Sequence, residues 1–192
     1  MGRLIISNSM TINGAFEAPV LAPDGWLVLD ADSQHASLQI WRAADAMVLG
    51  RKTYEGLAAV WPQLAEVPGF GAFADQMNSM PKYVASRTLR EPLEWNAKLL
   101  QGDLAESVTN LKDKHGGNLI VSGGGELAHA LISQGLVDEV WFTVSPYLWA
   151  TGPRIFNDIG PIPLELVATT TFPSGVVQLC YRLAPAEPPS TE

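Results

Sequence analysis

Short apolar runs alternate with segments of helical periodicity through most of the chain. The runs are typical of buried strands and are expected at residues 3–7, 46–49, 82–85 and 118–122. The segments between and after them favour helices, expected at residues 30–44, from 51, 72–80, from 104 up to Gly116, and 126–134. Strands that alternate with helices predict a largely parallel sheet covered by helices on both faces.

The pattern changes toward the C-terminus, where strands follow one another. Strands are expected at residues 139–145, 164–172 and 176–183, and Pro173-Ser174-Gly175 between the last two is typical of a hairpin. We therefore predict an α/β fold of three layers (αβα), with a mostly parallel central sheet and an antiparallel C-terminal hairpin. Residues 1–183 are expected to form one domain, and the Pro-rich residues 184–192 a disordered tail.

Composition narrows the classes of partner. The chain has 192 residues and a formal net charge of -8, which disfavours binding to a nucleic-acid backbone. No apolar run reaches the ~18 residues of a membrane span, and the apolar N-terminal run is too short for a signal peptide. One cysteine, Cys180, allows no internal disulfide and is read as a small buried side chain. From these features we expect a cytoplasmic protein. No metal site is expected, because the three histidines lack the spacing of metal ligands.

The first candidate binding segment is Gly50-Arg51-Lys52-Thr53, where an expected strand ends and a helix begins. The first amides of a helix are unpaired and favour an anion, whereas cations there oppose the helix dipole. A phosphate would resolve that conflict. A solvated pair of cations on an ordinary surface helix is an equally good interpretation of this segment alone.

Two further expected strands end in a similar way. Ser86-Arg87-Thr88 offers two hydroxyls and a guanidinium that can bind a phosphate, although a polar turn is the better interpretation of this segment taken alone. Gly123-Gly124-Gly125 lacks every β-carbon, so its backbone can approach a ligand closely; a tight strand-to-helix turn is the alternative. Gly123, Gly125 and Ala128 also fit a variant of the Rossmann fingerprint, but they come late in the chain and lack the expected acid downstream.

Together these segments resemble the dihydrofolate-reductase-like superfamily. Within it, the chain is most similar to the C-terminal reductase domain of riboflavin-biosynthesis deaminase–reductases and its stand-alone bacterial relatives. The resemblance covers Leu4 to about Leu183. It is carried by residues 48–55 (VLGRKTYE), 81–89 (PKYVASRTL), 123–127 (GGGEL) and 136–140, with Pro146, Gly152, Arg154, Ile155 and Phe156.

The resemblance implies an NADPH-dependent reductase that acts on a small heterocycle, with the pyrimidine intermediate of riboflavin biosynthesis as a candidate. It implies that Gly50, Arg51, Lys52 and Thr53 cradle the pyrophosphate. Ser86, Arg87 and Thr88, with help from Arg51, would hold the adenosine ribose and its 2′-phosphate. Gly123, Gly124, Gly125, Glu126 and Leu127 would lie against the pyrophosphate and the nicotinamide. A homodimer through the late strands is also implied.

The substrate side is less defined. Relatives often carry Asp-Gly after the first strand, where this chain has Asn13-Gly14. The candidate catalytic residues are Asn13, Asp30 and Asp32; an acid at either of the last two positions is also typical of a helix N-cap. Four tryptophans could wall an aromatic substrate or pack in the core: Trp26, Trp41, Trp61 and Trp149. A non-catalytic NADPH-binding or sensing module, and a Rossmann dehydrogenase that uses NAD, are the competing functions.

Overall fold

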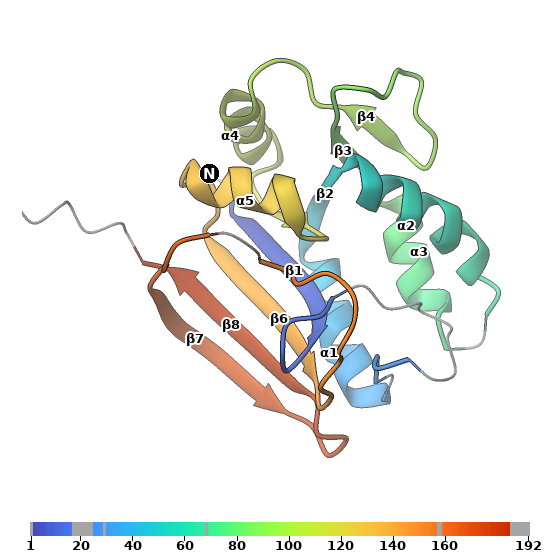
Figure 1. Cartoon of the computed structure of the whole chain (residues 1–192). Coiled ribbons are helices and arrows are strands. Elements are labelled where there is room, and N and C mark those ends of the chain that lie inside the picture. Colours follow the sequence, from blue (N-terminus) through green and yellow to red (C-terminus); the bar gives the residue numbers. More distant parts are fainter. Residues whose placement is uncertain (1, 17–24, 29, 68, 157–158, 185–192) are drawn as a thin grey trace, which may run out of the picture.

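The computed structural model describes residues 2–16, 25–28, 30–67, 69–156 and 159–184 and contains an eight-stranded sheet (Figure 1). Its strands are β1 (Leu4–Thr11), β2 (Ala44–Gly50), β3 (Lys82–Ala85), β4 (Ala97–Leu99), β5 (Asn118–Val121), β6 (Glu139–Ser145), β7 (Leu164–Thr171) and β8 (Val177–Leu183). They lie in the order β4-β3-β2-β5-β1-β6-β8-β7. The pairs from β4 to β6 are parallel, and β8 joins β6 and β7 antiparallel. The predicted parallel sheet with an antiparallel C-terminal hairpin is confirmed.

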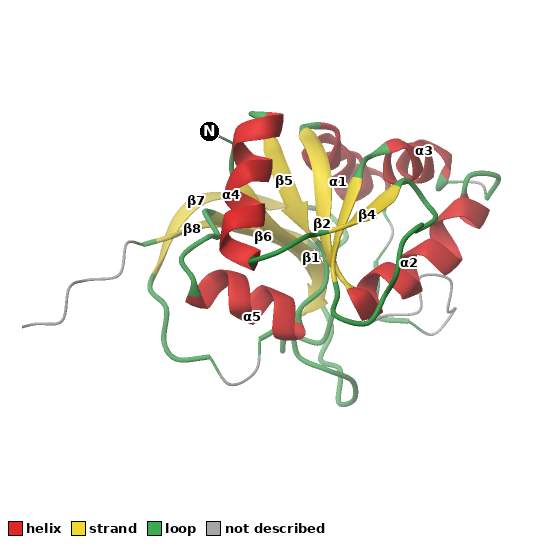
Figure 2. Cartoon of the chain, turned by 90° about the horizontal axis from the view of Figure 1, so that it is seen from above, coloured by secondary structure: helices red, strands yellow, loops and turns green. Residues whose placement is uncertain are grey.

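In the described part of the chain, five helices flank the sheet: α1 (Ala31–Arg42), α2 (Arg51–Leu64), α3 (Gly71–Ser79), α4 (Leu104–His115) and α5 (Gly125–Ser133). Seen from above, α4 and α5 lie on one side of the central strands, and α1 and α3 on the other (Figure 2). The hydrophobic clusters divide in the same way, with α2 joining α1 and α3. The predicted three layers are therefore confirmed.

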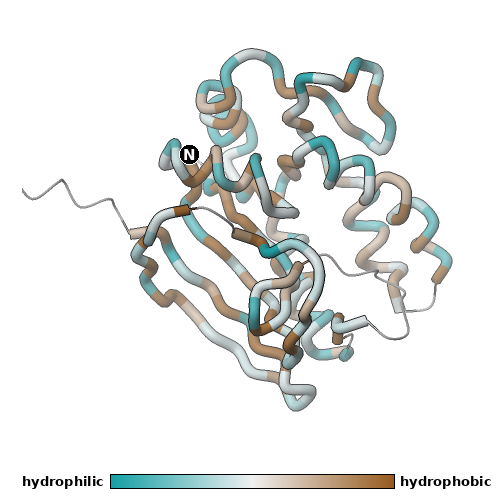
Figure 3. Tube along the Cα trace, in the orientation of Figure 1, coloured by the Kyte–Doolittle hydropathy of each residue, from teal (hydrophilic) through white to brown (hydrophobic). Residues whose placement is uncertain are grey.

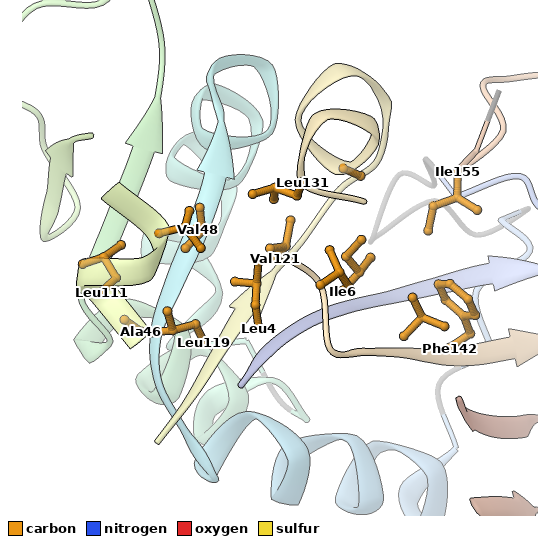
Figure 4. Packing of buried hydrophobic residues seen from close by; sticks show 14 residues of the cluster. Leu4, Ile6, Ala46, Val48, Leu111, Leu119, Val121, Leu131, Phe142 and Ile155 are labelled. Atoms are coloured by element: carbon orange, nitrogen blue, oxygen red, sulfur yellow. The ribbon is translucent and has the colours of Figure 1, made fainter. Parts of the chain in front are cut away.

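Successive residues of the central strands point to opposite faces, and both faces are buried. Ala46 and Val48 of β2 pack with Leu111 of α4 and Leu131 of α5 (Figure 4). The residues between and after them, Met47 and Leu49, pack with the helices of the other face; they and Val48 are fully buried. This double burial explains why the strands read as unbroken apolar runs, which are brown along the inner strands in Figure 3.

Two predicted helix boundaries are confirmed in atomic detail. Asp103 caps α4, because its Oδ1 accepts hydrogen bonds from the backbone N–H groups of Ala105 (2.9 Å) and Glu106 (3.1 Å). Gly116 ends the helix with a φ of 71°, in the left-handed region that favours glycine. These local signals fix where α4 begins and ends along the chain, between β4 and β5.

The structure differs from the expected elements in several places. The helix expected at residues 30–44 ends at Arg42, and β2 already begins at Ala44. The first strand continues to Thr11 through the polar residues Asn8 and Ser9, beyond its expected end at Ser7. The three-residue strand β4 was not expected; it pairs with β3 at the edge of the sheet, where a short strand needs little apolar sequence. Helix α5 begins one residue early, at Gly125. Residues 185–192, most of the expected tail, lie outside the described part of the chain.

No helix among the described residues is long and apolar enough to cross a membrane.

Candidate functional site

The three candidate binding segments follow strands that end at the same edge of the sheet. Gly50, the last residue of β2, pairs with Ala85, the last residue of β3. Val121 ends β5 and pairs with Val48 of β2. The segments that begin at Gly50, Ser86 and Ser122 therefore leave three neighbouring parallel strands at their carboxyl ends, where such sheets bind ligands.

The glycine turn after β5 packs closely against its neighbours. Gly123 has a φ of 90°, and a β-carbon there would overlap the Thr53 hydroxyl at the start of α2. A β-carbon at Gly124 would lie 2.5 Å from the backbone oxygen of Ile155. Glycine is thus required at both positions by the approach of other chain segments, and the turn after β5 is held against the segment after β2.

Asn8 of β1 fixes the same turn by a two-way hydrogen bond. Its Oδ1 accepts from the backbone N–H of Gly123 (2.7 Å), and its Nδ2 donates to the backbone oxygen of Gly123 (3.1 Å). Sequence analysis missed this residue. The available signal was a carboxamide directly after the apolar run of the first strand, on a strand that pairs with β5.

Helices α2 and α5 both start at this edge without a side-chain cap. Their N-cap residues are Gly50 and Gly124. The first turn of α2 contains no acid but carries Arg51 and Lys52. Arg51 pairs with Glu55 one turn on, at 3.2 Å between Nη1 and Oε2, and both side chains are exposed. An exposed pair of this kind contributes only about 0.3–0.5 kcal/mol, so Arg51 can be redirected to a stronger anion.

The neighbouring segment after β3 is a hydroxyl-stabilised turn. Ser86 Oγ accepts from the backbone N–H groups of Thr88 (3.2 Å) and Leu89 (3.0 Å). Arg87 at the head of the turn is exposed to solvent. The serine thus shapes a turn that presents a guanidinium beside the start of α2.

Lys82, at the start of β3, is a second residue that the sequence interpretation did not single out. It is 1% exposed, and its Nζ donates to the backbone oxygens of Met80 (2.6 Å) and Asn78 (3.3 Å). The ammonium also lies 4.1 Å from the centre of the Trp95 ring. Burial lowers the pKa of Lys82 to about 8. These hydrogen bonds join the end of α3 to β3, the strand that precedes the Arg87 turn. Lys82 therefore helps to position that turn.

A cavity of about 1100 Å³ lies on the sheet face that α1, α2 and α3 flank. Part of its wall belongs to the segments just described, namely Asn8, Lys52, Thr53 and Gly123. The middle of the wall comes from the three helices and the segment before α1, and it is largely aromatic and aliphatic: Trp26, Ile40, Trp41, Leu57, Val60, Trp61, Phe70, Phe73 and Met77. The site therefore joins a polar, glycine-lined part to an apolar one.

The remaining wall is the open face of β6, β8 and β7. Glu139 lies there, accepting from Arg3 Nη1 (2.9 Å) and from the indole N–H of Trp141 (2.7 Å). Burial, and then the neighbouring Glu139 carboxylate, raise the pKa of the Cys180 thiol to about 11. Cys180 is half-buried rather than fully buried and stays protonated at neutral pH, which argues against a reactive thiol.

None of the three candidate catalytic residues lines this cavity, and two of them, Asn13 and Asp30, have structural partners. Asn13 Oδ1 accepts from the backbone N–H of Trp149 (3.0 Å), and its Nδ2 donates to the Trp149 oxygen (3.0 Å). An aspartate could not donate the second bond, which explains the amide at this position. Asp32 is exposed in the first turn of α1.

Asp30 is the N-cap of α1. Its carboxylate accepts from the Ser33 backbone N–H (2.9 Å), from the Ser33 hydroxyl and from Ser174 Oγ (2.7 Å) in the β7–β8 turn. Burial raises the pKa of Asp30, but the hydrogen bonds from Ser33 and Ser174 outweigh it and leave the pKa below its usual value. A carboxylate held ionised in this way is suited to capping; a catalytic role for Asn13, Asp30 or Asp32 stays a prediction.

Among the described residues, no group of three or more His, Cys, Asp or Glu side chains is placed to hold a metal ion. Gly123, Gly125 and Ala128 do not form a Rossmann fingerprint. They follow β5 and not the first strand, and the strand order differs from the doubly wound 3-2-1-4-5-6 arrangement.

Comparison with known proteins finds relatives along nearly the full chain. YyaP of Bacillus subtilis (strain 168), named as uncharacterized, is 29% identical over 181 residues, which cover 94% of this chain and 94% of YyaP. A Shewanella sp. PV-4 structure named for riboflavin biosynthesis has a TM-score of 0.72 at 19% identity and covers 95% of this chain and 99% of its own.

A second solved structure comes from Thermotoga maritima and is named a diaminohydroxyphosphoribosylaminopyrimidine deaminase/5-amino-6-(5-phosphoribosylamino)uracil reductase. It has a TM-score of 0.62 at 13% identity and covers 95% of this chain and 57% of its own. At these identities the two structures show a shared fold. The model of the RibD C-terminal domain family matches residues 3–178, from the start of β1 into β8. By that match, the chain belongs to the RibD C-terminal domain family.

Proposed function

We propose that this chain is an NADPH-dependent reductase of a small heterocyclic substrate. The observation that carries the proposal is the meeting of two uncapped helix N-termini, α2 and α5, at the turn where Gly123 packs on Thr53. Unpaired amides at a helix N-terminus favour phosphate, and two such ends suit a pyrophosphate. Membership of the RibD C-terminal domain family, whose fold the Thermotoga maritima protein named a reductase shares, supports the same function.

The residues present fit a phosphorylated dinucleotide. Gly50 to Thr53 and Gly123 to Leu127 would hold the pyrophosphate together. The two segments lie side by side, because Leu127 is within 4 Å of the position that a β-carbon on Gly50 would take. Ser86, Arg87 and Thr88, with Arg51, would hold the adenosine ribose and its 2′-phosphate. Exposed guanidiniums in a chain of net charge -8 favour a doubly charged 2′-phosphate over a hydroxyl.

When bound, NADPH supplies a hydride for the reduction of a C=N or C=O bond. The chain's own residues would bind the cofactor and the substrate and orient them toward each other. Asn8 holds the Gly123 turn at the junction between the polar and the apolar part of the cavity. The aromatic wall excludes water from the substrate side. The pyrimidine acted on by the Thermotoga reductase is the first substrate to test, by family analogy.

A titration of the intrinsic tryptophan fluorescence with NADPH and NADH tests the proposal. NADPH is expected to bind at least about tenfold more tightly, which corresponds to about 1.4 kcal/mol. Equal affinities would contradict the assignment of residues to the 2′-phosphate. If neither nucleotide binds, the proposed reductase function is wrong. Oxidation of NADPH in the presence of 5-amino-6-(5-phosphoribosylamino)uracil or dihydrofolate then tests turnover.

One observation favours a non-catalytic NADPH-binding module as a second candidate: Asn13, Asp30 and Asp32 all lie outside the cavity wall. A protein that binds NADPH but reduces no member of a broad panel of carbonyl and imine compounds would support it. Turnover of any one of them would exclude it.

We also propose that two copies of the chain associate through the C-terminal hairpin. Every residue of β7, an edge strand, is exposed, including Leu166 at 58%. Exposed apolar edge strands pair readily with another chain. Light scattering is expected to give the mass of a dimer, and Leu166→Glu to shift it toward the monomer. A wild-type monomer at micromolar concentration would contradict this association.

A further inference from the structure

The loop that carries Arg87 connects β3 to β4 and spans residues 86–96. Arg87 is exposed, and its guanidinium forms no hydrogen bond or ion pair with the part of the chain that the structure describes; only its backbone oxygen accepts, from Arg90 Nη1 (3.5 Å). The place of the guanidinium therefore depends on how the loop backbone is held. Residues that hold this loop bear on any ligand that Arg87 binds.

The far end of the loop has an unusual backbone. Trp95 and Asn96 have φ angles of 57° and 51°, in the left-handed region. Asparagine tolerates that region, whereas a side chain as bulky as tryptophan seldom occupies it. Such conformations persist only where the surrounding structure holds them, and they are common at segments that clamp a ligand. The neighbours of Trp95 must therefore supply what the backbone itself does not favour.

These neighbours are the end of α3 and the start of β3. The indole N–H of Trp95 donates to Asn78 Oδ1 (2.7 Å), and the ammonium of Lys82 lies 4.1 Å from the centre of the indole ring. Asn96 Nδ2 donates to the backbone oxygen of Ser79 (2.9 Å), and the backbone oxygen of Asn96 accepts from the Lys82 backbone N–H (3.0 Å). The end of the loop is thus fixed to two elements of the fold.

A separate contact ties the loop to the start of α2. The hydroxyl of Tyr54, in the first turn of that helix, donates to the backbone oxygen of Glu94 (3.2 Å). Tyr54 is buried, and Leu89 and Leu93 of the loop pack against the same hydrophobic cluster. Tyr54 directly follows Thr53, so the turn of α2 that would bind the pyrophosphate also holds the loop that carries the guanidinium.

We propose that Tyr54 and Trp95 are positioning residues that set the preference for NADPH over NADH. This inference rests on the proposed function, in which Arg87 binds the 2′-phosphate. Tyr54 fixes the spacing between the loop and the start of α2, and Trp95 locks the end of the loop. Neither side chain belongs to the cavity wall, so each acts on the nucleotide through Arg87.

Tyr54→Phe tests the spacing, because it removes the bond to Glu94 and keeps the buried ring. Calorimetric titration of the full-length variant is expected to show an affinity for NADPH about fivefold below that of the wild type, with the affinity for NADH within about twofold. Tyr83→Phe is the matched control on β3: its hydroxyl meets His115 Nε2 and Lys114 Nζ, both at 3.0 Å, and not the loop. It should leave both affinities unchanged.

A double variant separates positioning from general stability. In the Arg87→Gln protein, where no guanidinium is left to position, Tyr54→Phe should no longer change the ratio of the two affinities. Trp95→Phe, which keeps a ring beside Lys82 but loses the bond to Asn78, should lower the same ratio and also lose its effect in the Arg87→Gln protein.

Three results would overturn the inference: an unchanged ratio in both single variants, an equal loss of NADPH and NADH, or an effect of Tyr54→Phe that persists without Arg87. The wild type is titrated first. A wild type that does not prefer NADPH counts against the proposed function, and the inference falls with it; a wild type that does prefer NADPH, with variants that keep this preference, counts against the inference alone.

Discussion

Apart from α3, which follows Phe70 without a side-chain cap, the described helices begin in two different ways. Helices α1 and α4 are capped by Asp30 and Asp103, whose carboxylates accept hydrogen bonds from the first free backbone amides. Helices α2 and α5 begin after Gly50 and Gly124, which have no side chain to offer. The first pair completes its own N-terminus, and the second pair leaves those amides open at the edge of the sheet.

The difference separates residues that serve stability from residues that serve binding. An aspartate cap contributes about 1 kcal/mol relative to alanine, and a few tenths of a kcal/mol relative to glycine, and it also suits the helix dipole. Helix α2 forgoes that contribution and places Arg51 and Lys52 where the dipole disfavours cations. Both departures become favourable once an anion occupies the site. Helices α2 and α5 are also the two that meet at the Gly123 turn.

The largest loss of NADPH affinity is expected from Gly123→Ala, which disturbs the turn where the N-termini of α2 and α5 meet. Alanine would have to adopt a φ of 90° and would overlap the Thr53 hydroxyl. We expect the affinity for NADPH to fall at least about 100-fold, or about 2.7 kcal/mol, in a fluorescence titration. Gly125→Ala is the matched control: its φ is 70°, but a β-carbon there meets no atom within 4 Å. Equal losses in the two variants would show that backbone strain, not the contact with Thr53, governs binding.

Gly50→Asp would convert an uncapped helix into a capped one. Gly50 has extended backbone angles, φ -78° and ψ 159°, which aspartate adopts without strain. The variant is expected to unfold at a slightly higher urea concentration, because the cap adds a few tenths of a kcal/mol. Its affinity for NADPH should fall about 10- to 30-fold, since a carboxylate then occupies the amides and repels the pyrophosphate.

Gly50→Asn separates the two contributions to that loss. Asparagine caps a helix about as well as aspartate but carries no charge. The asparagine variant should therefore share the gain in stability and lose less affinity for NADPH than the aspartate variant. If Gly50→Asp binds NADPH as well as the wild type, the open start of α2 does not receive a phosphate.

A smaller effect is expected at the turn beside α2. Arg87→Gln should reduce the preference for NADPH over NADH about tenfold while leaving the affinity for NADH nearly unchanged. Arg90→Gln, on the same loop, is the control, because the Arg90 guanidinium already donates to the Leu89 oxygen at 2.9 Å. A loss of affinity for both nucleotides in Arg87→Gln would indicate that the residue shapes the loop instead of reading the 2′-phosphate.

Much of the fold could be predicted because its strands are buried on both faces and its helices carry local end signals. Asp103 and Gly116 mark α4 whatever surrounds them. Strand β4 carries no comparable signal, since its three residues are held by pairing with β3. The glycine turn was also visible in the sequence, because a run of glycines has few other uses.

Residues that act across the fold could not be placed in this way. Asn8 meets Gly123 over 115 positions of sequence, and a single amide after an apolar run resembles the end of a strand. Asn13 and Asp30 were singled out for chemistry, but sequence position alone does not tell whether a polar side chain turns toward a cavity or toward the backbone. The partners of both became visible only with the β7–β8 turn and the Trp149 segment in place.

The smallest effect on the nucleotide is expected from removing a cap of the other pair. Asp103→Ala deletes the acceptor for the Ala105 and Glu106 amides, so the free energy of unfolding should fall by about 1 kcal/mol. Affinity for NADPH should stay within about twofold of the wild type, since α4 contributes no residue to the cavity wall. Urea unfolding and the fluorescence titration measure the two quantities on the same samples, with Asp103→Asn as the variant that keeps the cap. Should Asp103→Ala weaken NADPH binding as much as Gly50→Asp does, the two kinds of helix start would not differ in function, because any loss of helix stability would then be enough to disturb the site.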